Sequence, residues 1–240
     1  MGIYRIADFI VRLNNKYSYT DRLCAPYAIG GYPQHDFSVS ATLEEIAAEC
    51  ALSGQSEPSC ESTCLYRTLC GMLIPHNTFL LHAAVVEVDG RGYAFLGESG
   101  AGKSTHLSLW LKYFPAQVVN GDKPLIRKKT MPDGTVQFWA YGTPWSGKEC
   151  LQRNTSVPLA ALVFLEQAKQ NEIIKLDPAD CVKRIFHQLL LPKSAADAVR
   201  LLELIDTFVS TTPAYRLACD ISYKAAELCY STVVQNCRLT

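Results

Sequence analysis

The sequence lacks an export signal and an excess of charge. The N-terminal stretch MGIYRIADFIVRL carries charges among its apolar residues, has no signal-peptide core with a cleavage site, and is too short to span a bilayer. The 23 basic and 23 acidic side chains cancel, and no basic run exceeds Arg127-Lys128-Lys129. We therefore expect a cytoplasmic protein that binds neither nucleic acid nor a membrane surface.

The sequence also lacks the cysteine spacings of metal sites. It has ten cysteines but no CxxC pair. The nearest approach to a cluster is Cys60, Cys64, Cys70 and His76, whose gaps match no zinc or iron–sulfur pattern. Without an export signal, we interpret the cysteines as free thiols, and those of this cluster as small buried residues on a helix rather than metal ligands.

Two parts of the chain differ in pattern. Residues 1–55 are weakly patterned except for a helix over 43–52, which Thr42 and Glu45 open as a capping box and Gly54 ends. We predict a small α+β part there, and its position suggests a role in acceptor recognition. Residues 56–240 form the main domain, which begins with a helix after Ser59 that carries Leu65, Leu69, Met72 and Leu73 on one face. It ends in a mostly helical part, with helices over 178–191, 195–209 and 223–234.

The main domain is predicted to contain a mixed sheet. Two strand-like runs, 79–88 and 91–96, are separated only by Asp89-Gly90, a strong hairpin signal. The second run leads into a glycine-rich loop, whereas ordinary phosphate-loop folds place that strand in a parallel sheet. Further strands are expected at 117–120, 123–129, 136–142, 159–166 and 215–219, and a helix over 103–114. The fold class is therefore α/β with a mixed sheet and flanking helices.

Residues 97–104, GESGAGKS, match the phosphate-loop pattern G-x-x-x-x-G-K-[ST]. The glycines let backbone N–H groups point into one concavity, and the following helix adds its positive dipole end. Lys103 can reach the β- and γ-phosphates of a nucleotide, and the Ser104 hydroxyl can ligate Mg²⁺. The residues expected to bind the nucleotide are Gly97, Ser99, Gly100, Ala101, Gly102, Lys103, Ser104 and Thr105.

Phosphoryl transfer also requires a carboxylate and groups near the reacting phosphate. Asp122 ends the apolar strand QVVN and is the best metal-ligating acid, although Asn-Gly-Asp is turn chemistry as well. His82 lies in the run before the hairpin, where it either faces the γ-phosphate or is a satisfied core residue. Lys148 and Arg153, in the polar loop after Trp145, are either transition-state cations or solvated loop charges.

The order of these pieces resembles the HPr kinase/phosphorylase-related kinases of the phosphoenolpyruvate-carboxykinase superfamily. The resemblance covers about residues 60–192, and its most specific motifs are GKSTHLSLW and GTPWSGK. It implies a mixed β core flanked by helices, ATP with Mg²⁺, and transfer of a phosphoryl group to a hydroxyl, commonly a serine of a protein. Some similar proteins phosphorylate a serine of ribosomally made peptides, including lasso peptides. Many relatives assemble, which makes a homo-oligomer one expectation.

By the same resemblance, Lys103 matches the phosphate lysine, Ser104 the Mg²⁺ hydroxyl, Asp122 the acid after the central strand and His82 the histidine near the phosphate. Two departures stand out. This chain has Gly121-Asp122 where the family usually has two adjacent aspartates, and the arginine loop of true HPr kinases is not evident. We therefore expect an ATP-dependent serine kinase that acts on a protein or peptide. Two alternatives remain: a nucleotide-binding regulatory or assembly subunit with reduced catalysis, and a decarboxylating carboxykinase.

Overall fold

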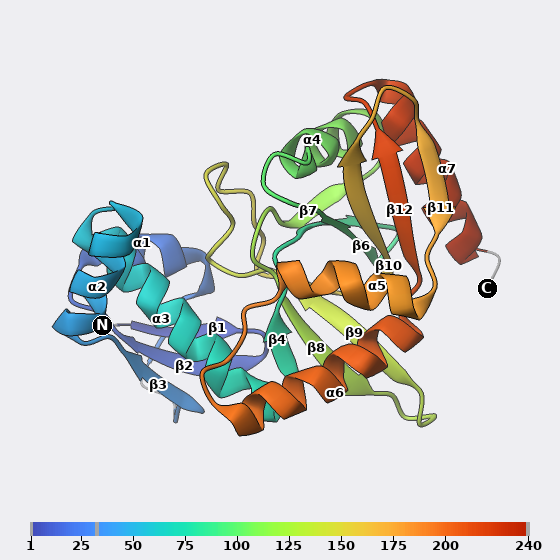
Figure 1. Ribbon diagram of the computed structural model, residues 1–240. Helices are drawn as coiled ribbons and strands as arrows, with labels where there is room; N and C mark the ends of the chain where they lie inside the picture. Colours follow the sequence, from blue (N-terminus) through green and yellow to red (C-terminus); the bar gives the residue numbers. More distant parts are fainter. Residues whose placement is uncertain (1, 32–33, 239–240) are drawn as a thin grey trace.

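The computed structural model describes residues 2–31 and 34–238, with side chains as far as residue 235 (Figure 1). Its N-terminal part contains a three-stranded sheet in which β1 (Gly2–Ile6) and β2 (Phe9–Asn14) are antiparallel and β3 (Phe37–Ser40) lies parallel to β2. The connection from β2 to β3 contains α1 (Ser18–Cys24) and the 3₁₀ helix η1 (Ala25–Tyr27). These strands are not predicted individually, because the Ala7-Asp8 turn adopts positive φ angles without the glycine that usually indicates such a turn.

Two helices follow this sheet. α2 (Leu43–Ser53) has the predicted capping box, in which Thr42 and Glu45 exchange two hydrogen bonds, and it ends at Gly54 with a φ of 67°. α3 (Glu57–Leu73) begins earlier than predicted and continues into the 3₁₀ helix η2 (Ile74–His76). Its Leu65 and Leu69 share a core cluster with β1 and β2, so α3 packs with the N-terminal elements, although the sequence assigns it to the main domain. Met72 is 36% exposed and is not one of its core residues.

The main sheet is mixed, as predicted. Its nine strands run in the order β4-β8-β9-β10-β6-β5-β7, with β12 pairing β10 and β11 pairing β12. The strands are β4 (Thr78–Leu80), β5 (Ala84–Val88), β6 (Arg91–Leu96), β7 (Gln117–Asn120), β8 (Leu125–Thr130), β9 (Val136–Tyr141), β10 (Ser156–Gln167), β11 (Glu172–Lys175) and β12 (Ala214–Cys219). The long strand β10 joins the two halves of the sheet, since its start pairs antiparallel with β9 and the rest pairs parallel with β6 and β12.

The predicted hairpins are confirmed: β5 pairs antiparallel with β6 around Asp89-Gly90, and β8 pairs antiparallel with β9. The expected single run over 79–88 is wrong in one respect, because it breaks at residues 81–83. β4 pairs with β8, whereas β5 lies between β6 and β7. His82 therefore lies in the segment between β4 and β5, which are not neighbours in the sheet.

Helices cover both faces of the β5/β6/β10 region (Figure 1). One face packs against α4 (Lys103–Tyr113) and α7 (Tyr223–Arg238), and the other against α5 (Pro178–Ile185) and α6 (Ala195–Thr211). The helix predicted over 178–191 is shorter than expected, because α5 passes into the 3₁₀ helix η3 (Phe186–Gln188) and then into extended chain at Leu189. Both faces of the sheet are buried, which explains why β6 and β10 are nearly continuous apolar runs.

Among the helices of residues 2–31 and 34–238, none is long and apolar enough to cross a membrane. Nine cysteines are free thiols, as predicted, and the side chain of Cys237 lies outside the described part. Within that part, no group of three or more His, Cys, Asp and Glu side chains is arranged to hold a metal ion.

Candidate functional site

The glycine-rich loop lies between β6 and α4, as the sequence predicts. Gly100 and Gly102 adopt φ angles of 85° and 101°, and Gly102 is the N-cap of α4. Gly97 has a φ of 151°, and a Cβ atom there would lie 2.9 Å from the carbonyl oxygen of Leu165 on β10. The Lys103 ammonium folds back over the loop and donates to the carbonyl oxygens of Gly97 (2.7 Å) and Glu98 (3.3 Å). The loop thus has the positive-φ glycines and the lysine contacts that the phosphate-loop pattern predicts.

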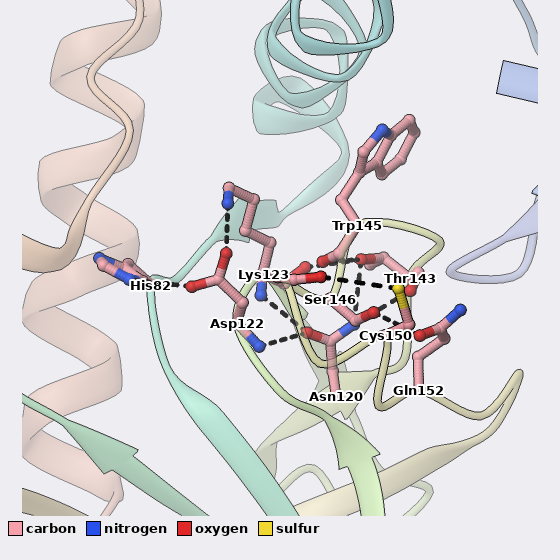
Figure 2. Close-up of polar contacts among 10 residues, drawn as sticks. His82, Asn120, Asp122, Lys123, Thr143, Trp145, Ser146, Cys150 and Gln152 are labelled. Atoms are coloured by element: carbon pink, nitrogen blue, oxygen red, sulfur yellow. Dashed lines mark hydrogen bonds and ion pairs between the residues drawn. The ribbon is translucent and has the colours of Figure 1, made fainter. Parts of the chain in front are cut away.

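Asp122 stands on a turn that Asn120 holds. Buried Asn120, the last residue of β7, accepts hydrogen bonds from the backbone N–H groups of Asp122 (2.9 Å) and Lys123 (2.7 Å). Its amide nitrogen donates to the carbonyl and hydroxyl oxygens of Thr143. The turn and functional interpretations of Asn-Gly-Asp are therefore compatible, because Asn120 makes the turn and leaves the Asp122 carboxylate free to point away from it (Figure 2).

The Asp122 carboxylate has a cationic or hydrogen-bonding partner on each oxygen (Figure 2). His82 Nε2 lies 3.0 Å from Oδ1, and the Lys123 ammonium forms an ion pair with Oδ2. Burial opposes ionisation of the carboxyl, but the hydrogen bonds from His82 and Lys123 outweigh it and lower the pKa of Asp122 to about 2. His82 is 41% exposed, so it is not the buried core histidine that the sequence left as an alternative.

His82 and Asp122 line a cavity of about 440 Å³, which we call the central cavity. Its lining includes the predicted residues His82, Ser99, Gly100, Gly102, Lys103, Ser104, Thr105, Asp122 and Lys148, together with Gly121, Gly147 and Glu149. Burial lowers the pKa of Lys103, and the negative charge of Asp122, which lines the same cavity, opposes this shift. Ser104 and Thr105 are exposed on the first turn of α4. Gly97 and Ala101 line an adjoining cavity of about 530 Å³ on the other side of the loop.

Arg153 is a correction to the predicted site. Its guanidinium donates to the carbonyl oxygen of Val118 and the side chain of Gln117, and forms an ion pair with Glu87 on β5. These contacts fasten the segment after Trp145 to the sheet edge, and Arg153 does not line the central cavity. His106 is buried and accepts a hydrogen bond from Trp110 Nε1 (3.0 Å), and burial lowers its pKa to about 4. It packs behind the loop against Trp110 and the Phe95 ring.

Three contributors to the site are not predicted from the sequence: Asn120, Lys123 and helix α3. Trp145 is buried against α3, where its indole N–H donates to the Ser62 hydroxyl (3.0 Å) and its ring contacts Tyr66. Lys123 lies with its ammonium 5.8 Å from the centre of the same Tyr66 ring. The Asn-Gly-Asp pattern indicates the turn, but no local signal indicates that a helix near residue 60 packs against the loop after Gly142.

The oxygens of the site suit Mg²⁺. The Ser104 hydroxyl and the Asp122 carboxylate line the same cavity, and Mg²⁺ prefers a few carboxylate and hydroxyl oxygens completed by water and phosphate oxygens. A cation at Asp122 Oδ2 would have to displace the Lys123 ammonium. Gly121, where the resembled family has its other acid, is enclosed: a Cβ atom there would lie 3.0 Å from the Ser146 carbonyl oxygen.

Comparison with known proteins gives a family for this chain. One solved structure with some similarity is the HPr(Ser) kinase/phosphatase from Coxiella burnetii, with 15% sequence identity and a TM-score of 0.36 over 67% of this chain and 90% of that one. No curated protein sequence matches at a significant level. The sequence model of the SynChlorMet cassette protein ScmC matches residues 66–228, which is more than half of the chain and includes all of the central cavity. The chain therefore belongs to the family of the SynChlorMet cassette protein ScmC.

Proposed function

We propose that this protein is an ATP-dependent kinase that transfers the γ-phosphoryl group to a hydroxyl, most simply a serine of a protein or of a ribosomally made peptide. The observation that carries the proposal is the central cavity, in which Lys103, Ser104, Asp122 and His82 meet. Cation, phosphate cradle and carboxylate are the parts that phosphoryl transfer requires, since the protein mainly positions the reactants and neutralises charge. We place the reaction in the cytoplasm, where free thiols stay reduced.

The loop and Lys103 would hold the nucleotide. Backbone N–H groups of residues 99–103 and the start of α4 favour phosphate oxygens. The Lys103 ammonium would exchange its two carbonyl contacts for the β- and γ-oxygens. Mg²⁺, held through Ser104 and Asp122, would neutralise charge on the phosphate oxygens.

Asp122 would hold the metal and orient the acceptor rather than act as a strong base. A carboxylate with a pKa of about 2 is almost fully ionised at neutral pH and is a weak proton acceptor. As the bond from the γ-phosphorus to the leaving oxygen breaks and the bond to the acceptor oxygen forms, the hydroxyl proton would pass to the imidazole of His82, which Asp122 orients. Lys148, exposed at the rim of the cavity, would face the charge that develops on the transferred group.

Transfer of label from γ-labelled ATP with Mg²⁺ to serine-containing peptides tests the proposal. We expect Lys103→Ala to lower transfer at least about 100-fold, which is typical of losing one charge-stabilising group. Lys112→Ala is a matched control, because Lys112 is exposed on the same helix and lies outside the cavity. If Lys103→Ala transferred as much label as the parent protein, the proposed kinase activity would be refuted.

A regulatory or assembly subunit that binds ATP without turnover is the second candidate. Two observations favour it: a side chain at Gly121 would crowd the backbone carbonyl of Ser146, and His82 and Lys123 engage both oxygens of the single acid. Tight binding of Mg·ATP with no label transfer and no ATP hydrolysis would support this candidate over the kinase.

A further inference from the structure

A third cavity, of about 600 Å³, lies between the N-terminal helices and the segment that precedes α6. We call it the α2–α3 groove. Its apolar lining includes Ala48, Leu52, Met72, Ile74, Leu190 and Leu191. Pockets of about 300–1,000 Å³ suit a small ligand or a short chain segment rather than a broad protein face.

Large apolar side chains at this groove are exposed. Leu52 on α2 is 85% exposed, Leu191 is 62% exposed and Met72 on α3 is 36% exposed. Apolar side chains gathered around one hollow mark an interaction site, whereas single exposed leucines need no explanation. Covering these side chains with the apolar surface of a partner would therefore be favourable.

The charges around the groove are compensated. Glu49 forms an ion pair with Arg67, and the positive charge of Lys193 acts on Glu45. The fifth charged side chain, Asp197, pairs within α6. Because these charges are already paired, a charged partner would gain little electrostatic attraction here. An apolar stretch of chain therefore fits the groove better than a charged one.

One short segment connects this groove to the central cavity. The backbone carbonyl oxygen of Gln188 accepts a hydrogen bond from the backbone N–H of His82 (2.8 Å), and the Gln188 side-chain amide lies 3.2 Å from the carbonyl oxygens of His82 and Gly97. Extended Leu189 then forms an antiparallel β-bridge with Leu81, and the residues that follow it, from Leu190 on, line the groove. The groove residue Lys193 lies five positions after Gln188, which corresponds to at most ~17 Å of extended chain.

We propose that the α2–α3 groove binds an apolar stretch of an extended acceptor peptide, whose serine reaches the central cavity about five residues away. This inference rests on the proposed kinase function and specifies its substrate class. The groove gives affinity through apolar side chains, and the span along residues 188–193 sets the distance between anchor and serine. The N-terminal part thereby takes part in acceptor recognition.

Binding without nucleotide tests the groove separately from the kinase. The probes are two pools of fluorescein-labelled peptides, each with one serine and otherwise random. One pool has a Leu-Leu pair about five residues from the serine on either side, and the other has Asn-Asn in its place. We expect the leucine pool to bind about tenfold more tightly in fluorescence anisotropy, a difference that one or two buried side chains supply.

Substitutions at exposed positions locate the binding. Leu52→Asp and Leu191→Asp are each expected to weaken the leucine pool about tenfold, and Ile221→Asp, at a 77% exposed residue outside the groove, to leave it unchanged. Equal binding of the two pools, or equal binding by all variants, overturns the proposal. So does a dimer in analytical ultracentrifugation that Leu191→Asp dissociates, because a second copy would then cover the groove. If peptides bind through the groove but no label is transferred to them from ATP, the kinase activity is refuted and the groove proposal stands. If label is transferred equally to the leucine and asparagine pools, the role of the groove is refuted and the kinase activity stands.

Discussion

His82 Nε2 lies 3.0 Å from Asp122 Oδ1, although the two residues reach the cavity from different segments: the break between β4 and β5, and the turn after β7. The break in the strand brings the imidazole to the carboxylate. A regular strand through residues 81–83 would continue the pairing of β4 with β8 and keep His82 in the ladder. The irregular backbone at this point is therefore part of how the candidate site is built.

Replacing Asp122 separates catalysis from nucleotide binding. Asp122→Asn keeps the size of the side chain and removes the charge that would hold the metal and orient the acceptor. We expect kcat to fall on the order of 100-fold, with the Kd for ATP changing less than about threefold because the loop and Lys103 carry most of that affinity. Steady-state kinetics and ATP titration measure the two quantities. Equal losses in both would assign Asp122 a purely structural role.

Asp122 also makes stability depend on pH. Because its folded-state pKa of about 2 lies below the ordinary value of 3.8, the ionised carboxylate stabilises the fold above pH 3.8 and this contribution disappears as the pH falls towards 2. Asp122→Asn should therefore lower the free energy of unfolding by about 1–2 kcal/mol at neutral pH and by much less near pH 2. Urea unfolding at both pH values checks this. Asp206→Asn, at an exposed position on α6, provides the comparison, and a pH-independent loss would contradict the linkage.

Restoring the second acid is expected to fail. A Cβ atom at Gly121 would lie 3.0 Å from the Ser146 carbonyl oxygen and 3.4 Å from that of Leu151, and both are backbone atoms. Gly121→Asp should lower the Tm and the free energy of unfolding by about 1–3 kcal/mol through overpacking, without raising label transfer. Gly121→Ala separates the steric from the charge effect and should already show most of the loss. A faster Gly121→Asp variant of normal stability would show that the site accommodates two acids.

Local signals predicted the loop, the hairpin before it and the mixed sheet, because Asp89-Gly90 and GESGAGKS determine their backbone within a few residues. The rest depends on distant contacts. Arg153 looked like a catalytic cation, but Glu87 and Gln117 on neighbouring strands hold it elsewhere. The sequence does not predict the N-terminal strands because their turn at Ala7-Asp8 has no glycine.

The contact of Lys123 with Asp122 cannot be predicted from the sequence for a similar reason. Its position beside Asp122 is plain in the sequence, but its direction depends on the turn that Asn120 makes and on the Tyr66 ring from α3. Asn120 belongs to the motif, but Tyr66 lies on a helix far away in the sequence. Residues that support a site from other elements are the ones that pattern alone does not identify.

Lys123 competes with a cation for Asp122. Its ammonium forms an ion pair with Oδ2, the oxygen that a metal would need if His82 keeps Oδ1. Lys123→Met retains the stem against Tyr66 and removes the charge, so the Mg²⁺ concentration for half-maximal ATP binding should fall about three- to tenfold. Titration of Mg²⁺ at fixed ATP measures it, with Lys112→Met as the control outside the cavity. A weaker Mg²⁺ dependence would mean that Lys123 helps to hold the phosphates instead.

The contact between Trp145 and Ser62 couples helix α3 to the loop that carries Lys148. Ser62→Ala leaves the buried indole N–H of Trp145 without its acceptor, which should lower the free energy of unfolding by about 1–3 kcal/mol. Ser62→Thr keeps a hydroxyl and should recover part of that loss. If the loop positions Lys148 over the reacting phosphate, Ser62→Ala should also lower kcat several-fold while leaving the Kd for ATP nearly unchanged, because the nucleotide cradle lies on β6 and α4. Normal kcat in a destabilised Ser62→Ala protein would confine the contact to a structural role.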